Sequence, residues 1–468
     1  MSSKPRADVA HLGDVVEINP RFGKDELDDT KLASFIPMKC VEEESGQFAS
    51  HEDRKVGEVR KGYTSFRNGD IIFAKVTPCM ENGKAAVVSG LTNGVGFGST
   101  EFFVLRTSER IDPKYLLHFV LQQSFRKEAA RNMTGAVGLR RVPKSWLEQQ
   151  RIPLPPIAAQ RQIVAEIEKQ FTRLDAGVAA LRRVQANLKR YRAAVLKAAC
   201  EGRLVPTEAE LAKAEGRRFE TGDELLARIL ADRRKNWQGR GKYKEPAAPD
   251  TANLSALPEG WVWGTAEQLT GLITDGEHIT PRRTASGVYL LSARNVLDGR
   301  ISLETVDYVP QEEYERIARR LTIEPGDILL SCSGSVGRST IVPEGLTFTL
   351  VRSVAVLKPM LAMGRYLSLA LRSPLLRSQI TNKQTQTAQA NIFQGKIKTL
   401  CFPLPSLGEQ TRIVAEVERR LSVIEELEAA VTANLARASR LRQSILQRAF
   451  SAEPSRRELS GLDARIQG

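Results

Sequence analysis

The strongest constraint on this chain is a line of sequence that it contains twice. Residues 153–171 read PLPPIAAQRQIVAEIEKQF, and residues 403–421 read PLPSLGEQTRIVAEVERRL. The copies align without a gap, with Gln160 matching Gln410, and identities continue as far as Ala199 and Ala449. A gapless repeat that begins at the same PLP tripeptide is improbable by chance, so we expect two copies of one structural unit.

Each copy predicts a long helix that starts after the PLP tripeptide. Proline lacks the amide hydrogen and fixes φ, so PLP cannot continue a helix or a central strand. Apolar residues then recur at steps of three and four, which is the heptad pattern of a coiled coil. A helix of about forty residues rises roughly 60 Å and needs a partner along its length, for which the other copy is the simplest candidate. The predicted seam comprises Val164, Ile167, Phe171, Leu174, Val178, Leu181, Val414, Val417, Leu421, Ile424, Val431 and Leu435.

The stretches that precede the two helices are of another kind. They mix short β-rich runs with Gly and Pro turns, and Gly69-Asp70 and Gly326-Asp327 each open a run that reads as a buried strand. We therefore expect an α+β chain in which two mixed α/β domains are joined by two long antiparallel coiled-coil helices. The predicted segments are a domain at 1–155, a helix at 156–203, a helix and linker at 204–256, a domain at 257–405, a helix at 406–451 and a tail at 452–468.

Composition favours a polyanionic partner inside the cell. The net charge is +14, which points to nucleic acid ahead of an anionic membrane. The five cysteines stand singly, without a CxxC pair, so neither a disulfide framework nor a zinc ribbon is indicated. The N-terminus has no signal-peptide core, and no run approaches the length of a membrane span. A cytoplasmic protein is the expectation.

Patterns that would mark an active site are missing from the sequence. There is no HExxH, and the four histidines are isolated, so a metal site has little support. SGSVGRST at 333–340 lacks the lysine of a phosphate loop and reads as a strand-turn-strand segment. GVGFGS at 94–99 enters a strand rather than a helix, unlike a dinucleotide-binding loop. The sequence therefore predicts a binding protein, with no catalytic residue, metal ion or cofactor of its own.

Polar loops in the two domains supply the candidate DNA-binding residues. Arg and Lys can bridge guanine O6 and N7, and Asn or Gln can bridge adenine N6 and N7, whereas other basic side chains hold phosphates. For any single residue, an ordinary solvated loop is about as probable as base contact. The candidates are Lys75, Lys84, Arg140, Arg141, Arg282, Arg283, Arg338, Lys383, Gln384 and Asn391.

These residues and repeats resemble those of the specificity subunits of type I restriction-modification systems, the HsdS family. The resemblance covers nearly the whole chain. It rests on GDIIFAKVTPCMENGK and GSTEFFVLRT in the first domain, on LPEGWVW and the Asp275-Gly276, His278, Pro281 pattern in the second, and on the doubled PLP entry. The second domain has SCSGSVGRS where the first has KVTPCMENGK, which in this family implies that the domains read different sequences.

The resemblance implies a function for each part. Each domain would be a target recognition domain for one half of a split, asymmetric site in double-stranded DNA, and the helices would fix the gap. The helices would also dock two methyltransferase subunits of HsdM type, which use S-adenosylmethionine. Two restriction and translocation subunits of HsdR type would join with ATP and Mg. The chain itself would be a non-catalytic subunit of the enzyme complex.

Two other interpretations remain open. One is a subunit of another bipartite restriction-methylation system. The other is a coiled-coil adaptor that joins protein partners without reading bases, from which a strongly salt-dependent affinity for DNA would distinguish the first reading.

Overall fold

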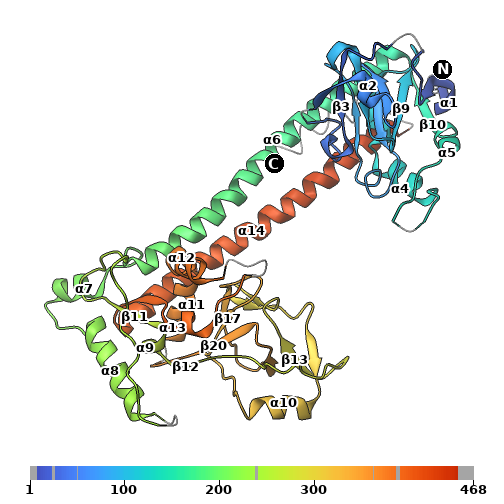
Figure 1. Ribbon diagram of the computed structural model, residues 1–468. Coiled ribbons are helices and arrows are strands. Elements are labelled where there is room, and N and C mark those ends of the chain that lie inside the picture. Colours follow the sequence, from blue (N-terminus) through green and yellow to red (C-terminus); the bar gives the residue numbers. More distant parts are fainter. Residues whose placement is uncertain are drawn as a thin grey trace, which may run out of the picture. The chain divides into compact units, whose positions relative to one another are not determined.

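A computed structural model describes residues 8–23, 27–49, 51–136, 138–237, 241–361, 363–385 and 390–451 (Figure 1). The chain divides into two compact units. Unit 1 comprises residues 1–182 with 432–468, and unit 2 comprises residues 183–431. The predicted tail at 452–468 lies outside the described residues, and the predicted segment boundaries stay predictions.

Unit 1 contains two four-stranded sheets and a terminal strand pair. One sheet has the order β2-β9-β6-β7, the other has the order β4-β3-β8-β5, and β1 pairs with β10. Strands β3 and β8 run parallel, and the other pairs are antiparallel. The strands are β1 (Asp8–His11), β2 (Val16–Ile18), β3 (Leu32–Ile36), β4 (Glu52–Lys55), β5 (Thr64–Arg67), β6 (Ile71–Ala74), β7 (Ala85–Val87), β8 (Val95–Gly98), β9 (Phe102–Thr107) and β10 (Arg151–Leu154). The helices are α1 (Leu12–Val15), α2 (Val56–Val59), α3 (Pro113–Val120), α4 (Gln123–Arg131) and α5 (Lys144–Glu148).

Unit 2 repeats this topology. Its four-stranded sheet has the order β12-β20-β17-β18, a three-stranded sheet has the order β16-β13-β19, and β11 pairs with β21. Strands β13 and β19 are again parallel. The strands are β11 (Val262–Thr265), β12 (Thr270–Asp275), β13 (Val288–Leu291), β14 (Val296–Leu297), β15 (Arg300–Ile301), β16 (Asp307–Val309), β17 (Ile328–Ser331), β18 (Ser339–Ile341), β19 (Phe348–Leu350), β20 (Val354–Pro359) and β21 (Cys401–Leu404). The helices are α9 (Ala266–Leu269), α10 (Gln311–Ala318), α11 (Gly364–Arg372), α12 (Pro374–Lys383) and α13 (Gln394–Lys398).

The two Gly-Asp turns form equivalent contacts in the two units. Each precedes a fully buried strand, β6 or β17, as the sequence predicts. In unit 1, Asp70 accepts hydrogen bonds from Arg106 Nε and Nη2 at 2.9 and 2.8 Å. In unit 2, Asp327 accepts from Lys358 Nζ at 2.8 Å. An ion pair thus ties the turn before the central strand to the neighbouring strand in both sheets.

The repeat forms two helices of 44 residues each, α6 (Ile157–Cys200) and α14 (Leu407–Phe450). The first turn of each helix shows why the glutamine after the PLP tripeptide is repeated. Gln160 is fully buried, and its Nε2 donates to the Pro155 and Arg110 carbonyls at 2.8 and 2.9 Å. Gln410 Nε2 donates to the Pro405 carbonyl at 2.9 Å. Each glutamine therefore fastens the start of its helix to the turn that precedes it.

The two helices run antiparallel in each unit, as predicted. In unit 1 the first part of α6 lies beside the last part of α14, and in unit 2 the order is reversed (Figure 1). Val164, Ile167 and Phe171 are buried, and they join the core of the unit 1 domain instead of contacting the partner helix alone. The predicted seam residues of α14 are buried from Val414 to Val431, whereas Leu174, Val178, Leu181 and Leu435 are half-buried.

Polar interruptions of the heptad pattern form ion pairs between the helices. In unit 1, Arg442 pairs with Asp175 at 2.7 Å, and its guanidinium lies 3.9 Å from the centre of the Phe171 ring. In unit 2, Arg192 pairs with Glu428 at 3.0 Å and with Glu425 at 3.6 Å. Arg192 matches Arg442 in the repeat, and Asp175 matches Glu425. The same ion pair therefore forms in both units, with the arginine on α14 in unit 1 and on α6 in unit 2.

The segment after α6 contains two helices, α7 (Glu208–Glu215) and α8 (Gly222–Lys235). The sequence predicts one helix in this segment, whereas the structure also has α7, which begins with a capping box of Thr207 and Glu210. The Glu208 carboxylate forms ion pairs with Arg217 and Arg412, at 2.7 Å each, and the second pair links α7 to the start of α14. Within the described ranges, no helix is long and apolar enough to cross a membrane.

Candidate nucleic-acid interface

The two predicted DNA-binding loops of unit 1 lie against each other. The loop after β6, which carries Lys75 and Lys84, is bridged to the segment that carries Arg140 and Arg141. Val142 N donates to the Lys75 carbonyl at 2.9 Å, and Thr77 N donates to the Arg140 carbonyl at 3.0 Å. The fold therefore brings together four cations that are up to 66 positions apart in the sequence.

These cations differ in how they are held. Arg141 forms a double hydrogen bond with Glu101, at 2.9 Å from Nε and 2.6 Å from Nη2, which lowers the pKa of the Glu101 carboxyl and raises that of the guanidinium. Arg140 lies 3.8 Å from Glu81. Lys75 Nζ lies 5.6 Å from the centre of the Phe103 ring. Lys84 Nζ donates to the Met38 carbonyl at 3.3 Å, so part of its hydrogen-bonding capacity is used within the domain.

Three segments of unit 2 converge in the same way. Ser333 is bridged to Asn391, and Ile392 N donates to the Cys332 carbonyl at 3.0 Å. Gln394 Nε2 donates to Asp275 Oδ1 at 2.6 Å, which joins the end of β12 to the start of α13. The segments that contain Asp275, Ser333 and Asn391 thus meet, although residues 386–389, before Asn391, lie outside the described part of the chain.

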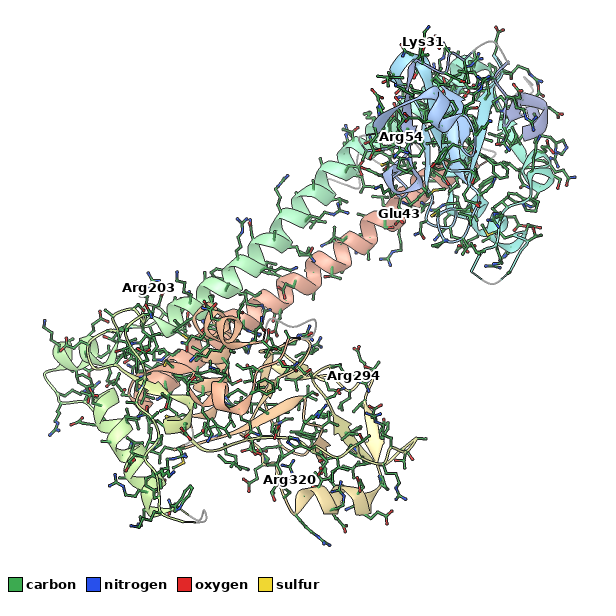
Figure 2. All side chains as sticks on the ribbon, in the orientation of Figure 1. Lys31, Glu43, Arg54, Arg203, Arg294 and Arg320 are labelled. Carbon is green, nitrogen blue, oxygen red and sulfur yellow. The ribbon has the colours of Figure 1, made fainter. Side chains whose placement is uncertain are left out.

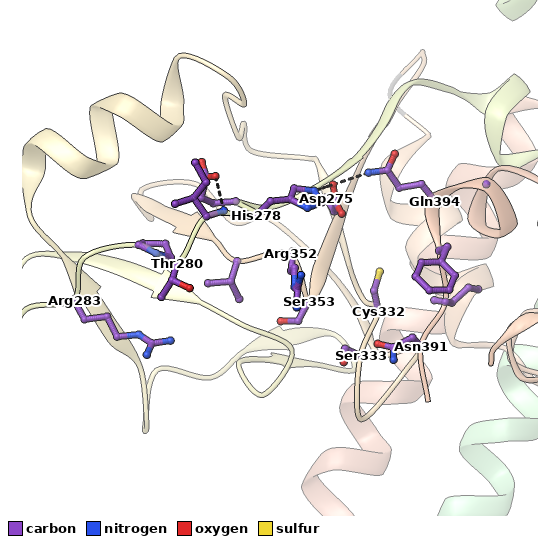
Figure 3. A pocket seen from close by; sticks show the side chains of 17 residues that line it. Asp275, His278, Thr280, Arg283, Cys332, Ser333, Arg352, Ser353, Asn391 and Gln394 are labelled. Atoms are coloured by element: carbon purple, nitrogen blue, oxygen red, sulfur yellow. Dashed lines mark hydrogen bonds and ion pairs between the residues drawn. The ribbon is translucent and has the colours of Figure 1, made fainter. Parts of the chain in front are cut away.

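A cavity of about 930 Å³ opens where these segments meet (Figure 3). Its wall includes Asp275 and His278 from the first segment, Arg352 and Ser353 from the turn before β20, and Asn391 from the last segment. Two apolar side chains in the lining are unusually bare, since Ile279 is 68% exposed and Phe393 is 65% exposed. Of the predicted residues, Arg283 and Asn391 line this cavity.

The other predicted residues of unit 2 lie around it. Arg282 pairs with Glu312, and Arg283 lies 3.4 Å from Asp307. Lys383 Nζ donates to Thr399 Oγ1 at 2.7 Å, and Gln384 is half-buried at the end of α12. No hydrogen bond or ion pair holds the Arg338 guanidinium within the described residues. Exposed cations also lie outside the predicted loops, and Figure 2 marks Lys31 in unit 1 and Arg294 and Arg320 in unit 2.

The two clusters occupy equivalent places in the repeated topology. The bridge between Val76 and Arg141 after β6 corresponds to the bridge between Ser333 and Asn391 after β17. At this level unit 1 places Lys75, Glu101 and Arg141, whereas unit 2 places Cys332, Ser353 and Asn391. The larger, ion-paired set of unit 1 is therefore replaced by small polar side chains in unit 2, which line the cavity.

Sequence reasoning missed several residues at this interface. Asp275 carries part of the family resemblance but is absent from the DNA-binding residues predicted from sequence, and so are Gln394, Phe393 and Arg352. Their shared signal is weak, because a cavity built from three distant segments leaves no local pattern. No group of three or more His, Cys, Asp or Glu side chains suited to a metal ion occurs among the residues described. Contact of the candidate residues with DNA stays a prediction.

Comparison with known proteins gives a consistent picture. The model of the type I restriction modification DNA specificity domain matches residues 7–179 and 312–435. The specificity subunit of the type I restriction enzyme EcoAI of Escherichia coli is 27% identical over 465 residues, covering 88% of this chain and 77% of that protein. The EcoEI specificity subunit of Escherichia coli is 25% identical, covering 89% and 78%.

A solved chain has a related fold. It comes from work on the complex assembly and conformational transition of the type I R-M system, and it is 20% identical, with a TM-score of 0.65. The match covers 96% of this chain and 99% of that one. On the family match, the relatives and the repeated fold together, this chain belongs to the type I restriction modification DNA specificity domain family.

Proposed function

We propose that this chain is the DNA sequence-specificity subunit of a type I restriction-modification complex, reading a bipartite, asymmetric site with one domain on each half. The observation that carries the proposal is the doubled architecture. Two domains share one topology, each gathers basic and amide side chains from distant loops, and each sits on a pair of antiparallel helices built from one repeat. The net charge of +14 suits a partner whose backbone is negatively charged.

The two domains are proposed to read different sequences. The framework that holds the loops is the same in both, whereas the side chains on the loops differ, with Arg141 in one unit where the other has Asn391. Arginine suits guanine, and asparagine suits adenine. Two half-sites on one connected chain also raise the effective concentration of the second contact and select one spacing, which is the role we assign to α6 and α14.

Catalysis is proposed to lie in partner subunits. The relatives are named specificity subunits, and in such a complex the chain would join two methyltransferase subunits of HsdM type and two restriction subunits of HsdR type. S-adenosylmethionine, ATP and Mg would be bound by those partners. This chain would determine the DNA sequence at which they act.

The test is to express the chain with its cognate methyltransferase and to map methylated adenines across a genome. The expected result is one motif of two short blocks separated by a fixed gap. A continuous motif, or methylation that does not depend on this chain, would contradict the proposal. DNA binding by the same complex should weaken steeply as salt rises, whereas a protein adaptor would show no such dependence.

A further inference from the structure

The Asp275 carboxylate in the unit 2 cavity uses only one of its two oxygens in hydrogen bonds to the described residues. Its Oδ1 accepts hydrogen bonds from Gln394 Nε2 at 2.6 Å and from His278 Nε2 at 3.0 Å (Figure 3). Its Oδ2 has no hydrogen-bond partner among the described residues, and the side chain is 19% exposed. The carboxylate is therefore held in one orientation by two donors, with one acceptor oxygen left over.

The neighbouring acid is in a different position. Glu277 accepts from the backbone N–H of Ile279 at 3.0 Å and lies 3.5 Å from Arg316, so both of its oxygens are engaged within the domain. The Asp275 carboxylate forms no ion pair with an arginine or lysine among the described residues, although Arg320 Nη2 donates to the Asp275 backbone carbonyl at 3.1 Å. A carboxylate with a free oxygen in the wall of a cavity can accept a hydrogen bond from a molecule that enters the cavity.

Duplex DNA offers few such donors. Phosphates repel a carboxylate, and guanine O6, N7 and thymine O4 are acceptors, whereas the major-groove donors are the exocyclic amino groups of adenine N6 and cytosine N4. Building on the proposed function, we infer that Asp275 is a specificity-determining residue that accepts a hydrogen bond from the exocyclic amino group of one adenine or cytosine in the half-site read by unit 2. Gln394 and His278 are positioning residues that hold the carboxylate.

The surroundings suit a base edge. Cys332, Ser353 and Asn391 are small, so the cavity stays open beside Asp275, where unit 1 places a lysine and an arginine–glutamate pair. Phe393 and Ile279 are exposed on the lining and can cover the apolar parts of a base or a thymine methyl group. Burial of these two side chains against DNA would also remove their unfavourable contact with water.

The test combines a protein variant with altered DNA. In the full chain with its methyltransferase, Asp275→Asn replaces the free acceptor by an amide while keeping the shape. Binding is measured to duplexes in which each adenine of the half-site is replaced by purine, or each cytosine by pyrimidin-2-one, so that one amino group is removed at a time. Removing the amino group that Asp275 reads should weaken wild-type binding about tenfold at one position. The base type at that position separates adenine from cytosine.

The asparagine variant should bind the natural site about as weakly as the wild type binds the altered one, and it should not distinguish the two duplexes. Gln394→Met, which removes a donor to Oδ1, should reduce the discrimination by a smaller factor. Glu315→Gln on α10, where Glu315 accepts from Gln311 at 3.0 Å, changes the charge equally outside the cavity and should discriminate as the wild type does.

Three outcomes separate the claims. If every amino-group removal weakens the wild type and Asp275→Asn equally, Asp275 reads no base and the inference is wrong. If the wild-type complex shows no sequence preference, the proposed function itself fails. Retained preference at the other positions of the half-site read by unit 2 shows that unit 2 has folded in Asp275→Asn, so a loss confined to one position supports the reading role.

Discussion

The two recognition domains share a framework and differ in the side chains that it presents. Strand order, the parallel pair at the second sheet and the ion pair behind the Gly-Asp turn recur in both. The tyrosine that seals each domain to its PLP segment recurs too, since Tyr115 Oη donates to the Pro153 carbonyl at 3.0 Å and Tyr366 Oη to the Pro403 carbonyl at 2.8 Å. The loop clusters do not recur. Packing fixes the framework, whereas exposed loops are free to change what is read.

The comparison predicts its largest effect at the Gly-Asp turns. Asp70→Ala should destabilise unit 1 by about 4 kcal/mol, because it leaves the two Arg106 hydrogen bonds unmade beside a buried turn. Asp327→Ala should cost about 2 kcal/mol in unit 2, because Lys358 donates one hydrogen bond to Asp327 where Arg106 donates two to Asp70. Denaturation followed by hydrogen exchange, which assigns the opening free energy to each unit, checks both values. Equal losses would show that the two hydrogen bonds to Asp70 add no stability over the single bond to Asp327.

The next prediction concerns acid. His118 is buried with neither ring nitrogen hydrogen-bonded, and burial, followed by the charges of Arg442 and Lys114, lowers its pKa to about 4. The unfolded chain binds this proton at about pH 6.5, so unit 1 should lose stability as pH falls from about 6.5 to 4, by roughly 3 kcal/mol in total.

Unit 2 provides the control for this prediction. Its α11 places buried Leu369 where α3 places His118. His118→Leu should therefore abolish the acid-induced loss in that pH window and leave stability at pH 8 unchanged or higher. Thermal unfolding of the variant and the wild type between pH 8 and pH 4 measures it. If the variant still loses stability as pH falls from about 6.5 to 4, that loss belongs to other titrating groups.

A smaller effect is expected at the ion pairs between the helices. Arg442→Met should cost about 1 kcal/mol, since Arg442 is 14% exposed and stacks on Phe171 as well as pairing with Asp175. Arg192→Met should cost about half as much, because Arg192 is 26% exposed and its guanidinium stacks on no aromatic ring among the described residues. Double-mutant cycles with Asp175→Asn and Glu428→Gln, at low and high salt, give the two coupling energies. A larger coupling at Arg192 would reverse the ranking.

Much of the framework could be predicted from sequence because its signals are local or repeated. The heptad steps after each PLP entry predict α6 and α14, and the Gly-Asp turns predict β6 and β17. The capping box that starts α7 was also present in the letters TEAE after Pro206, and it was overlooked.

The interface could be predicted only in part. The polar loops that contain Lys75 and Arg141 could be predicted from the neighbouring sequence. The partner of Arg141, however, is Glu101, which lies 40 positions away on another segment. The contact between Asp275 and Gln394 spans 119 positions. Parallel pairing of β3 with β8, and of β13 with β19, is likewise set by tertiary packing, which leaves no period in the sequence.

The central claim is that each domain reads its own half-site, and one exchange tests it directly. Residues 1–150 are replaced by the corresponding domain of a relative with another specificity, and the chimera is expressed with the cognate methyltransferase. Sequencing of methylated adenines should then show one half of the motif changed, with the other half and the gap between them retained. A motif that changes in both halves, or in neither, would contradict the account.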